Sequence, residues 1–422
     1  MAAARVLSSV LKSRRTLDDT LLTEADYSAL KGPDRAFART MVSAALRHLG
    51  RIDAVLLPLV DRPADRIGIE VASLLRIGAA QFWVLDTPDH AAVGETVAAA
   101  KRWPATAPAT GLVNAVLRKA AGMRDMFDQQ PAFRTWPDWL RADFASDLGE
   151  ADAERLAAVQ LETPDLHLTA KSDDAADAIA AAVAGRVIAA GSVALAPGAV
   201  TGLAGYEAGD WWVQDGAAAL AARLLAVRPG ETVFDLCAAP GGKTLQLAAA
   251  GADIIAVDRS KARLKRLKEN LARTGLGERV EVIAAEIEAW SPPVQADAIL
   301  LDAPCSALGT LRRHPEGAWI KSAKDVARFP AVQARFLKAA AQWLKPGGRL
   351  VYCVCTPRAE EGRDVIAAGL ASGTWQRMPI TAHEVPAFEH GLTETGDLLT
   401  LPAEGQRPFS HDAFFIARLQ KL

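Results

Sequence analysis

Apolar residues in the first third of the chain recur every three or four positions, which is the spacing of one buried helix face. The segments at residues 35–49 and 71–85 show this period clearly. Patterns typical of strands are scarce in the same region. We therefore predict that residues 1–130 form an all-α helical bundle.

The pattern changes in residues 131–205. Acidic side chains outnumber basic ones here, whereas residues 1–130 have a small basic excess. Residues 166–169 alternate like a short strand, and an Ala-rich helical run follows the Asp-rich residues 171–177. We predict a small α+β connector.

Short apolar strands alternate with helices in residues 206–422. This alternation is typical of an α/β domain with a Rossmann-like, doubly wound parallel sheet. The chain is therefore expected to have three parts. The strands that carry the argument below are predicted at residues 232–236, 253–257, 298–301 and 349–352.

Composition and charge exclude several classes of protein. The chain has 422 residues, of which 50% are hydrophobic and 23% charged, so it is neither largely disordered nor collagen-like. With 48 Lys+Arg against 50 Asp+Glu, no global basic field indicates a nucleic-acid partner, so such a partner would need a local patch. The most apolar stretch, residues 178–196, is interrupted by Arg186, and no membrane span is predicted.

The four cysteines bear on metal binding and on location. They are Cys237, Cys305, Cys353 and Cys355, and their spacing matches no zinc motif. The 7 histidines add no paired ligands, so no metal is expected. With no secretory signal in the sequence, we predict a reducing, cytoplasmic environment.

A glycine-rich turn follows the first of these strands. Residues 237–244 read Cys-Ala-Ala-Pro-Gly-Gly-Lys-Thr, and a helix follows. A strand, a glycine turn and a helix N-terminus together offer backbone N–H groups to a polar ligand, which favours a nucleotide-type site. The turn is not a P-loop, because Cys237 stands where that motif needs its first glycine. A tight turn without a ligand is the alternative.

Asp258 ends the next strand, 17 residues after Gly241. An acidic residue at this place commonly binds a ribose diol in such folds. The alternative is a helix N-cap, since residues 261–273 follow as a basic helix.

Two further strands carry cysteines at their carboxyl ends. One leads into Asp302-Ala-Pro-Cys305-Ser306 and the other into Cys353-Val-Cys355-Thr356. Ligands in open α/β sheets bind at these ends, so both loops are expected to face one crevice. Inert, buried thiols are the alternative for any single cysteine.

These motifs resemble those of the S-adenosylmethionine-dependent RNA cytosine-C5 methyltransferases, the RsmB/NOP/NSUN family. The pairing of Asp-Ala-Pro-Cys-Ser with a later Val-Tyr-x-x-Cys is far more specific than a glycine turn alone. Upstream, residues 34–39, 89–97 and 111–118 look like a NusB-type helical domain. Together these similarities point to the RsmB branch of the family, whose members act on small-subunit (16S) ribosomal RNA. The other matching segments are 235–244, Asp258, 301–306, 314–319, 344–356, 212–215 and 411–418.

The resemblance implies a mechanism and a set of site residues. C5 of cytosine is a poor nucleophile, so a thiolate must first add to C6. By similarity Cys355 is that nucleophile, Cys305 helps to release the product, and Asp302 lies between the cofactor and the base, where it supports the charge change at N3. The cofactor, S-adenosyl-L-methionine, would be held by Cys237, Ala238, Ala239, Pro240, Gly241, Gly242, Lys243, Asp258, Glu286 and Asp302.

Three positions depart from the family pattern. The family usually has Asp at Glu286, Ser at Cys353 and Asn at Gly94. We expect Cys353 and Cys355 on opposite faces of the strand, one packed and the other catalytic, with the motif register favouring Cys355.

The RNA surface is predicted from charge alone. Arg312 and Arg313 follow Cys305 closely and are candidate phosphate contacts. The basic residues within 261–268 either contact RNA or form a solvated helix face. A flipped cytosine would suit the site.

The expected partner is small-subunit ribosomal RNA, bound by a cytoplasmic monomer without a membrane contact. Two rivals stay open. One is a DNA cytosine-C5 methyltransferase, in which Cys305 would be the nucleophile. The other is a non-catalytic RNA-binding or antitermination protein with a vestigial cofactor fold.

Overall fold

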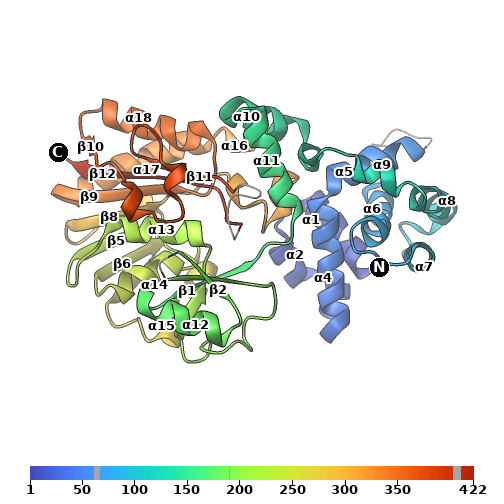
Figure 1. Cartoon of the computed structure of the whole chain (residues 1–422), viewed down its shortest axis with the longest axis horizontal. Helices are drawn as coiled ribbons and strands as arrows, with labels where there is room; N and C mark the ends of the chain where they lie inside the picture. Colours follow the sequence, from blue (N-terminus) through green and yellow to red (C-terminus); the bar gives the residue numbers. More distant parts are fainter. Residues whose placement is uncertain (61–66, 190, 403–409) are drawn as a thin grey trace. The chain divides into compact units, whose positions relative to one another are not determined.

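The computed structural model describes residues 1–60, 67–189, 191–402 and 410–422. The chain divides into two compact units. The first comprises Met1–Glu162 with Leu311–Ala323, and the second comprises Thr163–Thr310 with Lys324–Leu422 (Figure 1).

The first unit is helical, as predicted. Val6, Leu7 and Val10 on α1 are fully buried in its core, because their spacing places them on one face of the helix. The principal helices are α1 (Ala2–Ser13), α2 (Leu17–Thr23), α3 (Ala25–Ser28), α4 (Gly32–Arg47), α5 (Leu49–Leu56), α6 (Ile69–Trp83), α7 (Asp89–Arg102), α8 (Thr110–Ala121), α9 (Arg124–Asp128), α10 (Asp138–Leu148) and α11 (Glu150–Leu161).

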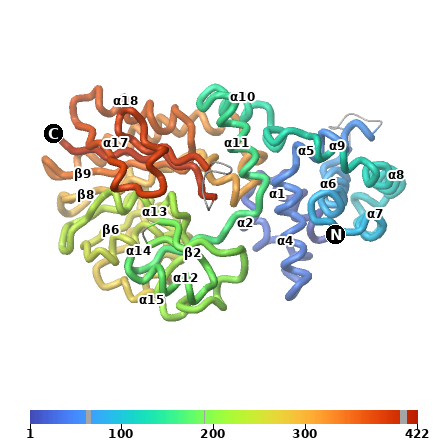
Figure 2. The backbone as a smooth tube through the Cα atoms, in the orientation of Figure 1, coloured from blue at the N-terminus to red at the C-terminus, as the bar shows by residue number. Residues whose placement is uncertain are grey.

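A short segment from the second half of the chain folds with these helices. It spans Leu311–Ala323 and contains the 3₁₀ helix η8 (Pro315–Ala318). On the colour scale of Figure 2 these residues are orange, whereas the helices of residues 1–162 run from blue to green. The buried Glu316 side chain accepts a hydrogen bond from the N–H of Leu17 at 3.1 Å. The guanidinium of Arg47 donates to the carbonyl of Arg312 at 2.7 Å. Sequence patterns did not indicate this placement.

Residues 131–205 do not form a separate connector in the structure. Helices α10 and α11 belong to the helical unit, and the remainder joins the second unit. There it forms a four-stranded sheet in the order β2-β3-β1-β4 whose pairs are antiparallel. The predicted strand at 166–169 is part of it. The elements are β1 (Leu166–Ala170), α12 (Ala176–Ala182), β2 (Arg186–Ala189), β3 (Ser192–Leu195) and β4 (Trp211–Val213).

The second unit also contains a large mixed sheet with the order β10-β12-β9-β8-β5-β6-β7, and β11 pairs with β12. Strands β9, β8, β5, β6 and β7 are parallel, and β12 runs antiparallel to β9. The strands are β5 (Thr232–Leu236), β6 (Asp253–Asp258), β7 (Val280–Ala284), β8 (Ala296–Asp302), β9 (Leu344–Val354), β10 (Trp375–Arg377), β11 (Leu398–Thr400) and β12 (Phe414–Lys421).

Both faces of this sheet are buried. Alternate residues of β5 pack into different cores: Val233 lies in one hydrophobic cluster and Phe234 in the other. Helices α13 (Gly216–Leu225), α14 (Gly242–Ala249) and α15 (Lys261–Thr274) supply the first cluster, and α17 (Phe329–Trp343) and α18 (Arg363–Ala371) the second. The predicted Rossmann-like α/β fold is confirmed. In the described ranges of both units, no helix combines the length and the apolar character needed to cross a membrane.

Candidate active site

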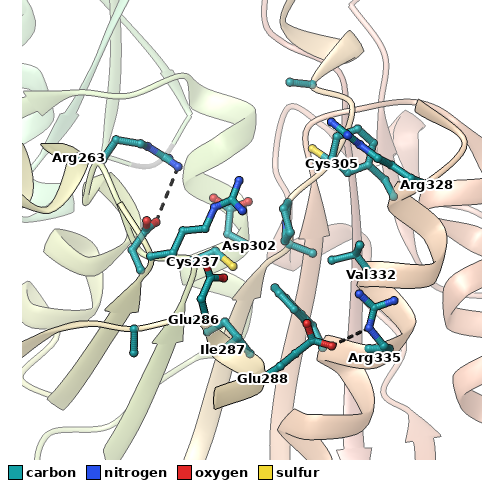
Figure 3. Close-up of a pocket in the computed structure, with 18 of the residues that line it drawn as sticks. Cys237, Arg263, Glu286, Ile287, Glu288, Asp302, Cys305, Arg328, Val332 and Arg335 are labelled. Carbon is teal, nitrogen blue, oxygen red and sulfur yellow. Dashed lines mark hydrogen bonds and ion pairs between the residues drawn. The ribbon is translucent and has the colours of Figure 1, made fainter. Parts of the chain in front are cut away.

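The carboxyl ends of β5, β6, β8 and β9 surround a cavity of about 690 Å³. The order of the sheet reverses direction at β5, where β6 and β8 flank it, and ligands bind at such a point in open α/β sheets. In the view of Figure 3, Cys237, Glu286 and Asp302 lie on one side of the cavity, and Cys305 and Arg328 on the other.

The glycine turn is shaped by backbone conformations that side chains rarely adopt. Cys237 has φ 64° and Gly241 has φ 109°. A Cβ atom at Gly241 would lie 2.2 Å from Cδ1 of Leu267 on α15, so only glycine fits at this close approach. Helix α14 then begins at Gly242 with no side-chain cap from the described residues, which leaves N–H donors at its N-terminus.

We expect Gly241→Ala to destabilise the protein more than Gly230→Ala does. Both glycines have positive φ, but a Cβ at Gly230 would meet nothing within 4 Å. The difference between the variants therefore isolates the clash with Leu267, expected to be about 1–3 kcal/mol of unfolding free energy. Urea denaturation of both variants measures it. Equal losses would mean that α15 moves away at no cost.

Asp235 lies beneath this turn and is fully buried. The hydroxyl of Thr244 on α14 donates to its Oδ2 at 2.6 Å. Burial raises the pKa of Asp235 to about 7, against the hydrogen bond from Thr244, and the nearby Asp302 carboxylate raises it further. The side chain thus holds its proton to a much higher pH than an exposed aspartate does.

This burial predicts a pH-dependent stability. As the pH rises from 4 to 7, the unfolded state loses the proton of Asp235 first, so the free energy of unfolding falls by about 4 kcal/mol. Asp235→Asn is neutral in both states and should weaken this dependence, making the variant more stable than the wild type at pH 8.

Urea titrations at pH 5 and pH 8 test the prediction. Asp297→Asn is a control of opposite sign, because a hydrogen bond from Lys345 lowers the pKa of Asp297 and its removal should reduce stability at pH 8. Identical pH slopes for the wild type and Asp235→Asn would contradict it.

Asp258 lies at the tip of β6, as predicted, and lines the cavity. Its Oδ2 accepts the N–H of Ala239 at 3.1 Å, and its Oδ1 accepts the N–H of Ser260 at 2.8 Å. The carboxylate therefore ties the glycine turn to β6. It is not the cap of α15, because Ser260 is the N-cap residue and its hydroxyl accepts from the N–H of Arg263.

The two loop thiols meet. Cys305, in the loop after β8, and Cys355, directly after β9, line the cavity with their Sγ atoms 3.3 Å apart. A hydrogen bond with Cys355, together with burial, raises the pKa of the Cys305 thiol well above its ordinary value. The Cys305 thiol therefore stays neutral at physiological pH.

Asp302, at the end of β8, has a partner on each oxygen. Lys243 Nζ donates to Oδ2 at 2.8 Å, and Cys353 Sγ donates to Oδ1 at 3.3 Å. Burial lowers the pKa of Lys243, but the Asp302 carboxylate outweighs it and the net shift is upward, so the ammonium keeps its charge. The sequence interpretation placed Lys243 among the backbone contacts of the turn and missed this ion pair.

The prediction of opposite faces for Cys353 and Cys355 is wrong. Side chains two residues apart on an extended chain share a face, and both cysteines pack against the same hydrophobic cluster. What separates them is depth: Cys353 is fully buried, whereas Cys355 lies beyond the strand end and lines the cavity.

Glu286 also lines the cavity, just before the 3₁₀ helix η6 (Ile287–Ala289). Four arginines also line the cavity and give it positive charge: Arg259, Arg263, Arg328 and Arg335. Only Arg263 was among the basic residues considered from the sequence. Arg259 directly follows Asp258 at the end of β6. Arg328 and Arg335 lie outside any motif and reach the cavity because α17 packs against β8.

Arg312 is not available to RNA in this structure. It is 1% exposed, within the segment that folds into the helical unit. Its neighbour Arg313 is exposed and stays a candidate phosphate contact.

The motifs at residues 212–215 and 411–418 form hydrogen bonds between elements of the second unit. The carboxylate of Asp215 accepts the N–H of Ala217 at the start of α13 and the N–H of Asp412 before β12. Gln214 bonds to Gln246 on α14 at 2.8 Å. The motifs at 212–215 and 411–418 therefore have a structural role in joining β4, α13, α14 and β12.

Within the described ranges, no group of three or more His, Cys, Asp or Glu residues could hold a metal ion.

Comparisons with known proteins agree with this geometry. Residues 222–420 match the family model described as 16S rRNA methyltransferase RsmB/F, and residues 1–122 match the NusB family. Ribosomal RNA small subunit methyltransferase B of Pseudomonas putida is 34% identical over 447 residues, covering 100% of this chain and 98% of the relative. The chain belongs to the ribosomal RNA small subunit methyltransferase B family.

A second relative and a solved structure extend this comparison. The methyltransferase B of Thermus thermophilus is 34% identical, covering 92% of this chain and 89% of the relative. The solved structure of PH0851 has the same fold, with a TM-score of 0.77 and 22% identity over 100% of this chain and 99% of that one. The resemblance predicted from the motifs is confirmed.

The residues of the cavity fit S-adenosylmethionine. Cys237, Asp258, Glu286 and Asp302 line the cavity, whereas residues 238–243 of the predicted cofactor site do not. Asp258 and Glu286 offer acceptors for hydroxyl and amino groups, and the turn that starts at Cys237 leads to the N–H donors of α14, which suit a carboxylate. The volume is within the usual range for a cofactor pocket. The glycine at 241 lets the turn lie close to α15.

Proposed function

We propose that this enzyme methylates C5 of a cytosine in small-subunit ribosomal RNA through a covalent bond between Cys355 and C6 of the base. The observation that carries the proposal is the pair of thiols, 3.3 Å apart, which line a cofactor-sized cavity together with Asp302, the carboxylate that pairs with Lys243. When bound, S-adenosylmethionine supplies the methyl group that C5 accepts.

Cys355 acts as the nucleophile in this proposal. Its thiolate adds to C6, and the electron pair of the C5–C6 double bond moves onto the ring, making C5 enamine-like. A proton taken up at N3 balances the negative charge on the ring. The Lys243–Asp302 pair lies near Cys353 and Cys355 and stabilises the charge that develops on the base. Lys243 is an addition to the residues expected from the sequence.

Cys305 acts in product release. Loss of the C5 proton to water re-forms the C5–C6 double bond as the bond between C6 and the Cys355 sulfur breaks, and N3 gives back the proton that it took up. The neutral thiol of Cys305 is placed to donate a hydrogen bond to the departing thiolate. Asp258, Glu286 and the turn from Cys237 to Lys243 hold the cofactor, and Arg313 contacts RNA phosphates.

The test is methyl transfer from labelled S-adenosylmethionine to small-subunit RNA from cells that lack the protein. The expected result is one labelled cytosine, mapped as 5-methylcytosine, and no labelling of DNA of the same sequence. Labelling of DNA alone would favour the DNA methyltransferase. Absence of both methyl transfer and cofactor binding would favour the RNA-binding protein. Cytoplasmic location and a monomeric state stay predictions.

A further inference from the structure

A buried carboxylate lies behind the two thiols and takes no part in the reaction described above. Glu361 ends the 3₁₀ helix η9 (Ala359–Glu361) and is fully buried. Its Oε2 accepts the N–H of Ser306 at 2.8 Å and Nε2 of Gln333 at 3.1 Å, and its Oε1 pairs with Arg358 at 3.2 Å. Burying an ionised group costs free energy unless it is paired and hydrogen-bonded, and here both oxygens have partners.

These bonds join the two loops that carry the thiols. Ser306 directly follows Cys305, whereas Arg358 and Glu361 belong to the loop that follows Cys355. A second bond crosses the same gap, from the Ser306 hydroxyl to that of Thr356 at 3.1 Å. Glu361 is thus the point where the loop after β8 is fixed to the loop after β9.

A third and a fourth contact hold this junction in place. Gln333, on α17, donates both to Glu361 and to the carbonyl of Pro304 at 3.0 Å, so the helix fixes the residue before Cys305 as well. The hydroxyl of Tyr352 on β9 donates to the backbone carbonyl of Glu361 at 2.6 Å. Cys305 is therefore held through the residues on both of its sides.

The charges around Cys305 come from a few elements. Cys355 faces it from the end of β9, Tyr352 from within β9 and Glu361 from η9, while α17 presents the neutral Gln333. Arg328 lines the same cavity. Besides the bond with Cys355 and burial, the charges of Cys355 and Glu361 raise the pKa of the Cys305 thiol.

We propose that Glu361 is a positioning residue that holds the Cys305 loop against Cys355 and, through its negative charge, keeps the Cys305 thiol neutral. The role of hydrogen-bond donor that the proposed function gives to Cys305 then depends on Glu361. The role rests on the proposed function, but its effect on the thiols exists without RNA or cofactor.

The first test is the pH profile of alkylation of each cysteine by iodoacetamide, followed by mass spectrometry of the full chain. Only the thiolate reacts, so the midpoint reports protonation. Glu361→Gln keeps the size of the side chain and removes the charge. We expect its Cys305 midpoint to fall by about one pH unit, which is about a tenfold gain in reactivity below the midpoint.

The neighbouring Glu360→Gln is the matched control. Glu360 pairs with the same Arg358, at 2.9 Å, but its side chain is 58% exposed, so solvent screens its charge. We expect the control to leave the Cys305 profile in place. An unchanged profile in folded Glu361→Gln, judged by near-ultraviolet circular dichroism, would overturn the charge role.

Glu361→Asp tests the positioning role separately. It also keeps the proposal testable if Glu361→Gln does not fold. It keeps the charge but is too short to hold the Ser306 N–H. With diamide, which is reduced to its hydrazine as two thiols form a disulfide, we expect Cys305 and Cys355 to couple at least about tenfold more slowly than in the wild type. A wild-type rate would overturn the positioning role. Because neither readout uses RNA, their success alongside failed methyl transfer would reject only the proposed function.

Discussion

Cys355→Ala should abolish methyl transfer, with a loss of at least about a thousandfold. Without the sulfur no bond to C6 can form, C5 stays unreactive, and more than about 4 kcal/mol of barrier lowering disappears. Binding of S-adenosylmethionine should change little, because the glycine turn, Asp258 and Glu286 are untouched. The measurements are the transfer rate to RNA, cofactor affinity by calorimetry, and covalent protein–RNA adducts on denaturing gels.

Cys353→Ser is the matched control for this prediction. It changes a sulfur two residues away and retains a donor to Asp302, which Cys353 contacts at 3.3 Å. The control should keep most of the activity. If Cys355→Ala still formed adducts while Cys305→Ala did not, the roles of the two thiols would have to be exchanged.

Cys305→Ala should trap the enzyme on its product. Cys355 can still add to C6, but the departing thiolate loses the neighbouring thiol that lies 3.3 Å away as a hydrogen-bond donor. We expect methylated RNA to stay bound covalently and multiple turnover to fall at least about a hundredfold, whereas a single turnover still labels the RNA. Label in the protein band of a denaturing gel measures the adduct.

Cys305→Ser distinguishes hydrogen bonding from space filling. Its hydroxyl is also a donor, so it should release product faster than Cys305→Ala does. Normal turnover in Cys305→Ala, with no adduct, would remove Cys305 from the mechanism and leave its thiol a packing residue.

The sequence determined the fold class and the strand ends that carry the site. The strand predicted at 232–236 matches β5, and the one at 253–257 matches β6 to within one residue. Local patterns suffice here because apolar runs and turn residues act over a few positions. Asp258, Asp302, Cys305 and Cys355 then had to lie near one another, since the carboxyl ends of parallel strands share one edge of a sheet.

Only the tertiary structure decided which side chains meet across long separations in sequence. No local pattern indicates that Lys243 reaches Asp302, that Glu361 bonds to the loop of Cys305, or that residues 311–323 pack into the helical unit. Arg312 carries the charge that a phosphate contact needs, yet packing buries its side chain. Periodicity states which face of an element is apolar, whereas the partner of a polar side chain depends on which element lies against it, and that is set by the packing of the whole unit.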